Sequence, residues 1–176
     1  AQEEMDFLKE AANMEEFTRN NQGIRYIRCP KLYHEYTTSR VLVMEYIGGC
    51  PVGDKKSLEG EGYDLGEIGR KLVNNYVKQV MDDGFFHADP HPGNVKVLDG
   101  KIVWIDMGMM GRLTNRDRKL MGQAVRAIAV GDIAMLESTI MELGDVQGKV
   151  DSGKLYGELR DLIDRYGNAG MGSIDA

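Results

Sequence analysis

The spacing of apolar residues in the first third of the chain predicts one helix followed by extended segments. Residues 1–20 are rich in Ala, Glu, Met, Leu and Lys, and their apolar members fall near one stripe, which predicts a helix. Three stretches rich in β-forming residues follow, over 24–28, 31–36 and 40–47, with turn residues between them. The last contains the run VLVMEYI, so we expect a strand buried on both faces that ends in a turn at Gly48 and Gly49.

The rest of the pattern predicts a long helix, a hairpin and a helical end. Residues 55–62 are charged and Gly-rich, and we expect a surface connection there. One apolar face over 65–82 predicts an amphipathic helix that ends at Gly84. Asp99-Gly100, between two apolar runs, is a strong signal for a two-residue hairpin. Thr114 is a good N-cap, and three helices are expected beyond it, over 117–130, 133–143 and 154–166.

Composition and charge exclude some functions without pointing to one. The 176 residues are 42% hydrophobic and 28% charged, so we expect one soluble globular domain. A net charge of −6 gives no support for nucleic acid or anionic lipid as a partner. The two cysteines, Cys29 and Cys50, have no paired spacing, which favours a reducing compartment over a zinc module. Neither a membrane span nor a signal peptide is apparent. Because the chain opens inside a predicted helix, without an initiator Met, we expect a piece of a longer protein.

The segment from His87 to Gly108 carries the candidate chemistry. Asp89 is followed five residues later by Asn94, and Asp106 comes directly after the predicted hairpin. Phosphoryl transfer requires one carboxylate that orients the attacking group, and an amide oxygen and a second carboxylate that hold Mg²⁺. The kinase signature keeps its spacing here, with HAD in place of H-R-D and DMG in place of D-F-G. Asp89 is therefore the candidate catalytic residue, and Asn94 and Asp106 are the candidate metal ligands.

The two histidines of this segment raise the alternative of a zinc site. His87 and His91 have the i, i+4 spacing that places two ligands on one face of a helix. Pro90 and Pro92 rule out that helix and stiffen the loop instead. We therefore expect His87 to form local hydrogen bonds that brace the loop.

The octet HADPHPGN, preceded by GFF and followed by IDMGMMG, resembles the UbiB family of atypical kinases, which includes the ADCK proteins. The resemblance implies an α+β, protein-kinase-like fold, with the end of the small lobe and the hinge over 1–50 and a truncated, mostly helical large lobe over 51–176. It also implies ATP and Mg²⁺ as cofactors, and His87, His91 and Gly108 as residues of the family motif.

The predicted first helix strengthens the resemblance. Its segment EMDFLKEAANMEEF is similar to the family helix in which an E-x-D pair precedes E-A-x-N. Glu4 and Asp6 match the pair, and Glu10 matches the Glu that pairs with a Lys on the phosphates. Without the resemblance, these acids would be read as a solvated helix face.

The resemblance also implies where adenine binds and what the chain lacks. Main-chain groups of Glu45, Tyr46 and Ile47 would hold adenine at the hinge. The phosphate-binding Lys, the nucleotide loop and the family's K-x-G-Q segment do not occur in these residues. We therefore expect the chain alone to bind nucleotide poorly and to be inactive.

The family supports ubiquinone or other isoprenoid-quinone biosynthesis, and its ATPase activity is better attested than protein phosphorylation. The resemblance implies nucleotide, quinone-biosynthesis proteins or an isoprenoid lipid as partners. It also implies a place at the cytoplasmic face of a bacterial membrane, which regions outside this chain would contact. Two alternatives stay open: a small-molecule phosphotransferase of the aminoglycoside type, which shares the H-x-D-x-x-x-x-N loop, and a non-catalytic, nucleotide-sensing scaffold.

Overall fold

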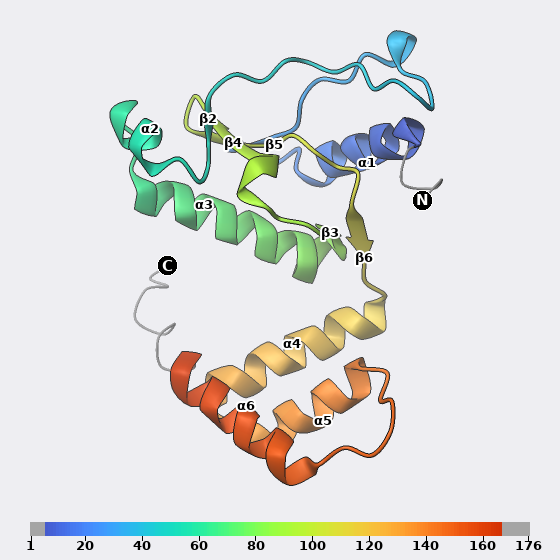
Figure 1. The fold of residues 1–176 in the computed structure, drawn as a ribbon, viewed down its shortest axis with the longest axis vertical. Helices are drawn as coiled ribbons and strands as arrows, with labels where there is room; N and C mark the ends of the chain where they lie inside the picture. The colour runs from blue at the N-terminus through green and yellow to red at the C-terminus, as the bar shows by residue number, and fades with distance from the viewer. Residues whose placement is uncertain (1–5, 167–176) are drawn as a thin grey trace. The chain divides into compact units, whose positions relative to one another are not determined.

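The computed structural model describes residues 6–166, which form two compact units, one ending at Arg112 and the other beginning at Leu113 (Figure 1). The first unit mixes helices with short strands and the second is helical, so the architecture is α+β, as predicted. The predicted lobe boundary near residue 50 does not coincide with this division and stays a prediction. The first unit contains α1 (Phe7–Asn20), β1 (Ile27–Arg28), η2 (His34–Tyr36), β2 (Cys50–Pro51), α2 (Lys55–Gly60), α3 (Leu65–Lys78), the π-helical turn η3 (Gln79–Asp83), β3 (Phe85–His87), η4 (Pro92–Asn94), β4 (Val95–Leu98), β5 (Lys101–Trp104) and β6 (Met110–Arg112).

Two small sheets organise the first unit. The larger sheet has the order β1-β5-β4-β2, in which β1 runs parallel to β5 and the other neighbours are antiparallel. The second sheet pairs β3 with β6 and joins the two ends of the segment that carries the candidate chemistry. The predicted hairpin is confirmed as β4 and β5. Asp99 and Gly100 both have positive φ, as a two-residue turn of this kind requires.

Trp104 is the largest side chain at the centre of the first unit's core. It is fully buried, stacks on the Tyr76 ring with centroids 6.4 Å apart and meets the edge of Phe17 at 6.2 Å. These contacts join β5 to both long helices, because Phe17 belongs to α1 and Tyr76 to α3. The buried members of this core are Met14, Phe17, Ile27, Cys50, Leu58, Ile68, Phe85, Val95, Val97, Ile102, Trp104 and Met107.

Both predicted helices of the first unit are confirmed. The Asp6 side chain caps α1 by accepting a hydrogen bond from the Leu8 N–H at 3.1 Å, and Ala11, Met14 and Phe17 supply its buried stripe. The predicted start of this helix, including Glu4, lies outside the described residues. Asp64 caps α3 in the same way, and Gly84 ends the following π-helical turn in the left-handed conformation.

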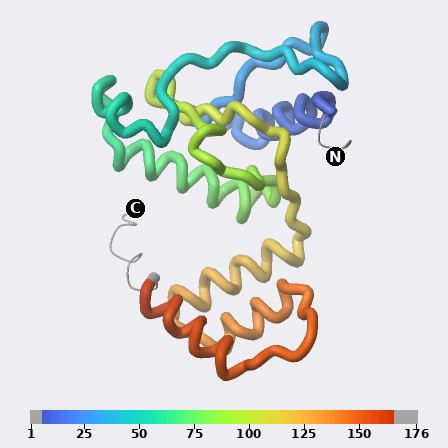
Figure 2. Tube along the Cα trace, in the orientation of Figure 1, coloured from blue at the N-terminus to red at the C-terminus, as the bar shows by residue number. Residues whose placement is uncertain are grey.

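The strand predicted over 40–47 is wrong in one respect, because it is not buried on both faces. Residues 31–33 and 41–45 run side by side as extended chain (Figure 2), joined at the Leu32–Met44 bridge. Leu42 and Met44 pack on the core, whereas Val41 and Tyr46 are 51% and 89% exposed. Paired with only one short neighbour, the segment buries a single face.

The surface connection predicted over 55–62 is also wrong, since Lys55–Gly60 forms the short helix α2. The Asp54 side chain accepts from the Ser57 N–H at 3.1 Å, which caps the helix. Leu58 is 1% exposed and anchors the turn in the core. Charged and Gly residues dominate this stretch, and the helix depends on one cap and one apolar anchor.

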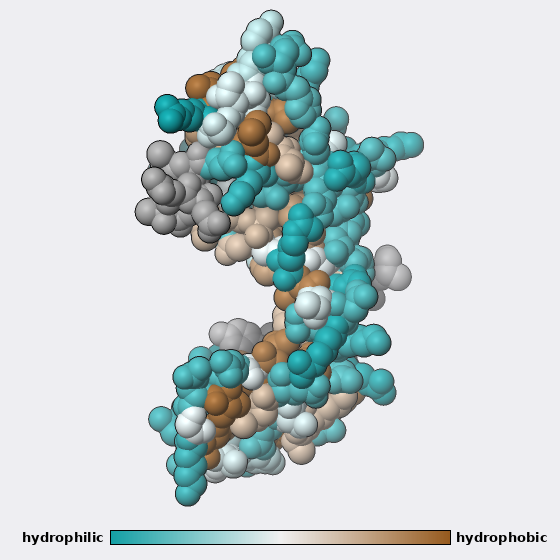
Figure 3. All heavy atoms as spheres, turned by 90° about the vertical axis from the view of Figure 1, so that its right-hand side faces the viewer, coloured by the Kyte–Doolittle hydropathy of each residue, from teal (hydrophilic) through white to brown (hydrophobic). Residues whose placement is uncertain are grey.

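The second unit confirms the three predicted helices, which are α4 (Asn115–Val130), α5 (Ile133–Leu143) and α6 (Ser152–Tyr166). Thr114 and Asp117 form a reciprocal capping box at the start of α4. The small core consists of Ala127, Leu136, Leu159 and Ile163. Apolar patches remain at the surface of this unit (Figure 3), and Val125, Val130 and Tyr156 are among the exposed apolar side chains. Among the described residues, no helix is long and apolar enough to cross a membrane.

Gly49 offers a test of the bend before β2. It has φ of 73°, and a Cβ there would lie 2.2 Å from the Val97 carbonyl oxygen. We expect Gly49→Ala to lower the free energy of unfolding by at least about 1–2 kcal/mol, from the left-handed conformation alone. Urea denaturation followed by the fluorescence of Trp104, the single tryptophan, measures it.

Gly48→Ala is the matched control, because a Cβ at Gly48 meets nothing within 4 Å and its φ is not positive. This variant should stay within about 0.5 kcal/mol of the parent. Equal losses in the two variants would show that the bend at Gly49 imposes no special constraint.

Candidate active site

His87 is buried beneath the candidate site, and every polar group of this residue has a partner. Its N–H donates to Gln79 Oε1 at 3.0 Å, and its C=O accepts from the Tyr76 hydroxyl at 3.1 Å. Its ring Nδ1 accepts from the Asp89 N–H at 3.2 Å, so Nε2 carries the proton and donates to the Asp106 carbonyl at 2.6 Å. The ring also stacks on Trp104, with centroids 5.1 Å apart. His87 therefore braces the loop, as predicted, and also fixes the segment at Asp106.

The turn between Asp89 and Asn94 is held by its own hydrogen bonds. The Asp89 carbonyl accepts from the His91 N–H at 2.7 Å and from Asn94 Nδ2 at 3.2 Å. His91 is exposed, and its Nδ1 accepts from the Gly93 N–H at 3.0 Å, which caps η4. The Asp89 side chain is exposed, and Asn94 is half-buried, with its amide nitrogen bound to the Asp89 carbonyl.

The hairpin joins this turn to the second candidate carboxylate. The Asn94 carbonyl accepts from the Ile105 N–H at 3.0 Å, directly before Asp106. Asp106 is exposed, and its Oδ1 accepts from the Gly108 N–H at 2.9 Å. A Cβ at Gly108 would lie 3.3 Å from that oxygen, so the absent side chain leaves room beside the carboxylate.

Helix α1 reaches the same segment through two side chains one turn apart. Glu10 Oε1 accepts from the Met107 N–H at 3.3 Å, and Asn13 Nδ2 donates to the Met107 carbonyl at 2.9 Å. The Met107 side chain is fully buried, as expected of an apolar residue at this position. Glu10 thus lies close to the segment that carries Asp106.

Burial raises the pKa of Glu10, and the nearby Asp106 carboxylate raises it further, against the opposing effect of the Met107 hydrogen bond. A cation near the two carboxylates would stabilise their charged forms. The site therefore has the charge that a metal ion or an ammonium group would complement.

The three candidate hinge residues lie in the extended segment before β2. The Glu45 N–H donates to the Lys31 carbonyl at 2.8 Å, and the Ile47 carbonyl accepts from Lys96 Nζ at 2.8 Å. The Glu45 side chain pairs with Arg28, and the Tyr46 ring is 89% exposed.

A pocket of about 510 Å³ lies between α1 and the segment that follows β1. Glu45 is part of its lining, but Asp89, Asn94 and Asp106 are not. The pocket is therefore separate from the candidate chemistry.

Four residues that hold the main chain of the candidate site were not predicted from the sequence. Asn13 lies at i+3 from Glu10, within the quoted E-A-x-N pattern, and this spacing was the one available signal. Asn75 and Gln79, at i, i+4 on α3 and its extension, were hidden within an otherwise amphipathic helix. Tyr76 was assigned to the apolar face, and its hydroxyl contact with His87 could not be seen from spacing.

Comparisons with known proteins identify the family of the chain. Residues 1–139 match the ABC1 atypical kinase-like domain. An uncharacterized protein of the hydrogenase 1 5′ region of Clostridium pasteurianum is 37% identical over 172 residues, which are 98% of this chain and 32% of that protein. Protein ACTIVITY OF BC1 COMPLEX KINASE 8, chloroplastic, of Arabidopsis thaliana is 37% identical over 145 residues, which are 81% of this chain and 19% of that protein.

A solved structure supports the fold. The complex of Rv3197 with erythromycin from Mycobacterium tuberculosis aligns with a TM-score of 0.62 at 22% identity, covering 93% of this chain and 42% of that one. The chain thus spans less than half the length of these relatives. The fold is kinase-like, and the match over residues 1–139 confirms the resemblance noted in the sequence: the chain belongs to the ABC1 atypical kinase-like family.

Proposed function

We propose that the chain is the central part of a UbiB-like atypical kinase or ATPase that uses Mg-ATP. The observation that carries the proposal is the anchoring of Asp89 and Asp106 by one buried imidazole, that of His87. Phosphoryl transfer depends on positioning and electrostatic stabilisation more than on covalent chemistry of the protein. A shared rigid anchor beneath two exposed carboxylates supports such a role.

The donor atoms present fit Mg²⁺. This ion prefers oxygen ligands and is commonly held by one or two carboxylates together with nucleotide phosphates. The Asn94 amide oxygen and the Asp106 carboxylate supply protein oxygens of this kind, and the bound ion would neutralise phosphate charge. In the described part of the chain, no group of three or more His, Cys, Asp or Glu side chains is arranged to hold a metal.

Asp89 is assigned the orienting role. Its main chain is fixed on both sides, by the His87 ring and by Asn94, while its carboxylate stays exposed. A carboxylate held in this way can orient a hydroxyl or a water molecule and accept its proton. Whether the acceptor is water, a lipid or a protein distinguishes an ATPase from a kinase.

Glu10 is assigned the role of an ion-pair partner. Its carboxylate is half buried beside Asp106, where its pKa is raised. A Lys from outside the described residues, placed on the phosphates, would complement this charge.

The biological role proposed for the whole protein is support of ubiquinone or other isoprenoid-quinone biosynthesis at the cytoplasmic face of a membrane. It follows from the resemblance to the UbiB family, with quinone-biosynthesis proteins or an isoprenoid lipid as partners. The Arabidopsis relative is named as a kinase, and this name supports the phosphoryl-transfer part of the proposal.

Asp106 tests the metal site. In the full-length protein, Asp106→Asn should weaken magnesium-dependent ATP binding by about tenfold or more, because a hydrogen bond or ligand contact to a charged group contributes roughly 1.5–3 kcal/mol. The fold should persist, since Asn can still accept from the Gly108 N–H. Titration calorimetry with and without Mg²⁺ measures the change. Asp99→Asn, at the hairpin turn, is the matched control, and undiminished binding in Asp106→Asn would contradict the assignment.

Glu10 tests the electrostatics of the site. Its pKa is raised in the folded chain, so the folded state binds the proton more tightly than the unfolded state, in which Glu has a pKa of about 4.3. The parent should therefore lose stability relative to Glu10→Gln as the pH rises from about 4 to 7. Urea unfolding across this range measures the difference, which should vanish at the acidic end.

Glu16→Gln is the matched control on the same helix. The Arg112 guanidinium binds Glu16 through two contacts, at 2.8 and 2.5 Å, and lowers its pKa. This contribution is present above about pH 4.3 and is lost as the pH falls through the folded pKa, so Glu16→Gln should be the less stable chain at pH 7. If Glu10→Gln were also less stable than the parent at pH 7, Glu10 would have a stabilising partner within the chain.

Asp89 decides between an enzyme and a nucleotide-sensing scaffold. In the full-length protein, Asp89→Asn should reduce ATP turnover by about 10²- to 10⁴-fold, the usual range for such a group. ATP affinity should persist, because the carboxylate orients the attacking group and is not assigned to the ion. Turnover and equilibrium binding are measured on the same preparation, with Asp99→Asn as control. Parent-like turnover would make the scaffold the better function.

A further inference from the structure

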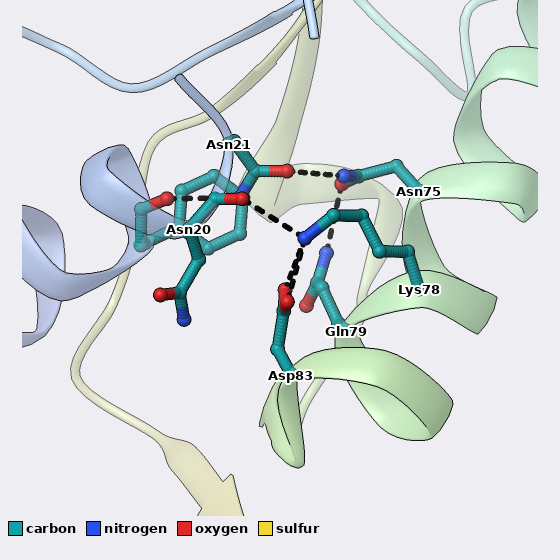
Figure 4. A network of polar contacts seen from close by, with 7 residues as sticks. Asn20, Asn21, Asn75, Lys78, Gln79 and Asp83 are labelled. Atoms are coloured by element: carbon teal, nitrogen blue, oxygen red, sulfur yellow. Dashed lines mark hydrogen bonds and ion pairs between the residues drawn. The ribbon is translucent and has the colours of Figure 1, made fainter. Parts of the chain in front are cut away.

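A chain of four buried hydrogen bonds connects the end of α1 with the main chain of His87. Figure 4 shows the part of this chain that runs from Asn21 through Asn75 to Gln79. The His87 N–H donates to Gln79 Oε1 at 3.0 Å, and Gln79 Nε2 donates to Asn75 Oδ1 at 2.9 Å. Asn75 Nδ2 donates to Asn21 Oδ1 at 2.7 Å, and Asn21 Nδ2 donates to the Phe17 carbonyl at 2.8 Å. None of the three amide residues is more than 5% exposed.

The direction of this chain is fixed at both ends. The His87 N–H can only donate, so the oxygen of Gln79 must face it, and the Phe17 carbonyl can only accept. Each amide between them therefore has one permitted orientation. Trp104 Nε1 adds a second donor to Asn75 Oδ1 at 3.0 Å, which enforces the same orientation. Turning any of the three amides would leave buried polar groups without partners.

Gln79 occupies an unusual place in the helix. It is the first residue of the π-helical turn that extends α3, and such turns occur frequently at functional sites. It is also fully buried. Its side chain thus connects the interior of α3 to the first residue of the HADPHPGN loop.

We propose that Gln79 is a positioning residue for the reaction, acting with Asn75 through the main chain of His87. The inference rests on the proposed function. Gln79 fixes the His87 N–H, and the His87 ring in turn holds the Asp89 N–H and the Asp106 carbonyl. The main chains of Asp89 and Asp106 are thereby tied to α1, the helix that carries Glu10.

A second contact fastens α1 without touching His87. Lys78 Nζ donates to the Asn20 carbonyl at 2.9 Å and to both oxygens of Asp83, at 2.6 and 2.8 Å (Figure 4). It therefore shares with Gln79 the task of joining α1 to α3. Only Gln79 continues to the loop, so Lys78 supplies the control that separates positioning from stability.

The test compares Gln79→Met with Lys78→Met in the full-length protein. Methionine fills a similar volume but can neither accept from His87 nor donate to Asn75. We expect kcat for ATP turnover to fall by roughly 10- to 100-fold in Gln79→Met, as for a misplaced catalytic group, with KM for ATP within about twofold of the parent. Lys78→Met should keep the parent's kcat although its melting temperature also falls.

Hydrogen exchange supplies a readout that does not depend on activity. The His87 amide should exchange faster in Gln79→Met, after correction for global stability, and at the parent's rate in Lys78→Met. An unchanged kcat in Gln79→Met, or equal losses of kcat in the two variants, would overturn the inference. If Asp89→Asn turned over ATP as fast as the parent, the proposed function would be contradicted instead. If the His87 amide of the parent exchanged without protection, the hydrogen bond from His87 to Gln79 would be contradicted.

Gln79→Glu keeps the inference testable if the methionine variant does not fold. A protonated Glu can accept from His87 and donate to Asn75, whereas its carboxylate can only accept. The kcat of this variant relative to the parent at the same pH should approach one at low pH and fall as the pH rises. The charged or titratable residues Lys78, Asp83, His87, Asp89 and Asp106 lie nearby or in the loop in both chains, so the ratio cancels the pH dependence that the two chains share. A flat ratio would overturn the inference.

Discussion

The hydrogen bond from His87 Nε2 to the Asp106 carbonyl, at 2.6 Å, is the contact on which the site depends. It joins two segments that are 19 residues apart in the chain, within a core where the ring is fully buried against Trp104. The opposite nitrogen of the same ring holds the Asp89 N–H, so a single tautomer serves both contacts. A buried imidazole with two bonded nitrogens cannot rotate without losing both hydrogen bonds. The buried His87 ring therefore fixes the position of the Asp89 segment relative to the Asp106 segment.

This arrangement separates the parts that must be rigid from the parts that must meet solvent. The main chains around Asp89 and Asp106 are held by buried side chains, while both carboxylates are exposed. Helix α1 holds the same region independently, because Glu10 and Asn13 bind the N–H and the carbonyl of Met107. A site built in this way can keep its geometry while the charge of a bound ligand changes.

Prediction succeeded where the signal was local. The hairpin follows from the positive φ that Asp99 and Gly100 accept, and α4 follows from the Thr114 cap, because a few neighbouring residues determine each of them. It failed where burial depended on distant partners. The run VLVMEYI looked like a central strand, but its neighbours cover one face only. Asn75 and Gln79 were missed for the same reason, since nothing in their spacing shows that an amide points at His87.

The short segment after Asp106 is ordered by the chain itself. Residues 110–112 form β6 against β3, and the Ala88 N–H donates to the Met109 carbonyl at 2.9 Å. Arg112 then lies over the Phe85 ring, 4.5 Å from its centroid, and binds Glu16 of α1 through both of its terminal nitrogens. Kinases whose activation loops are ordered by phosphorylation gain new arginine contacts from the phosphate. Here Glu16 of α1 supplies the anion that Arg112 binds, so contacts within the chain hold the segment that follows Asp106.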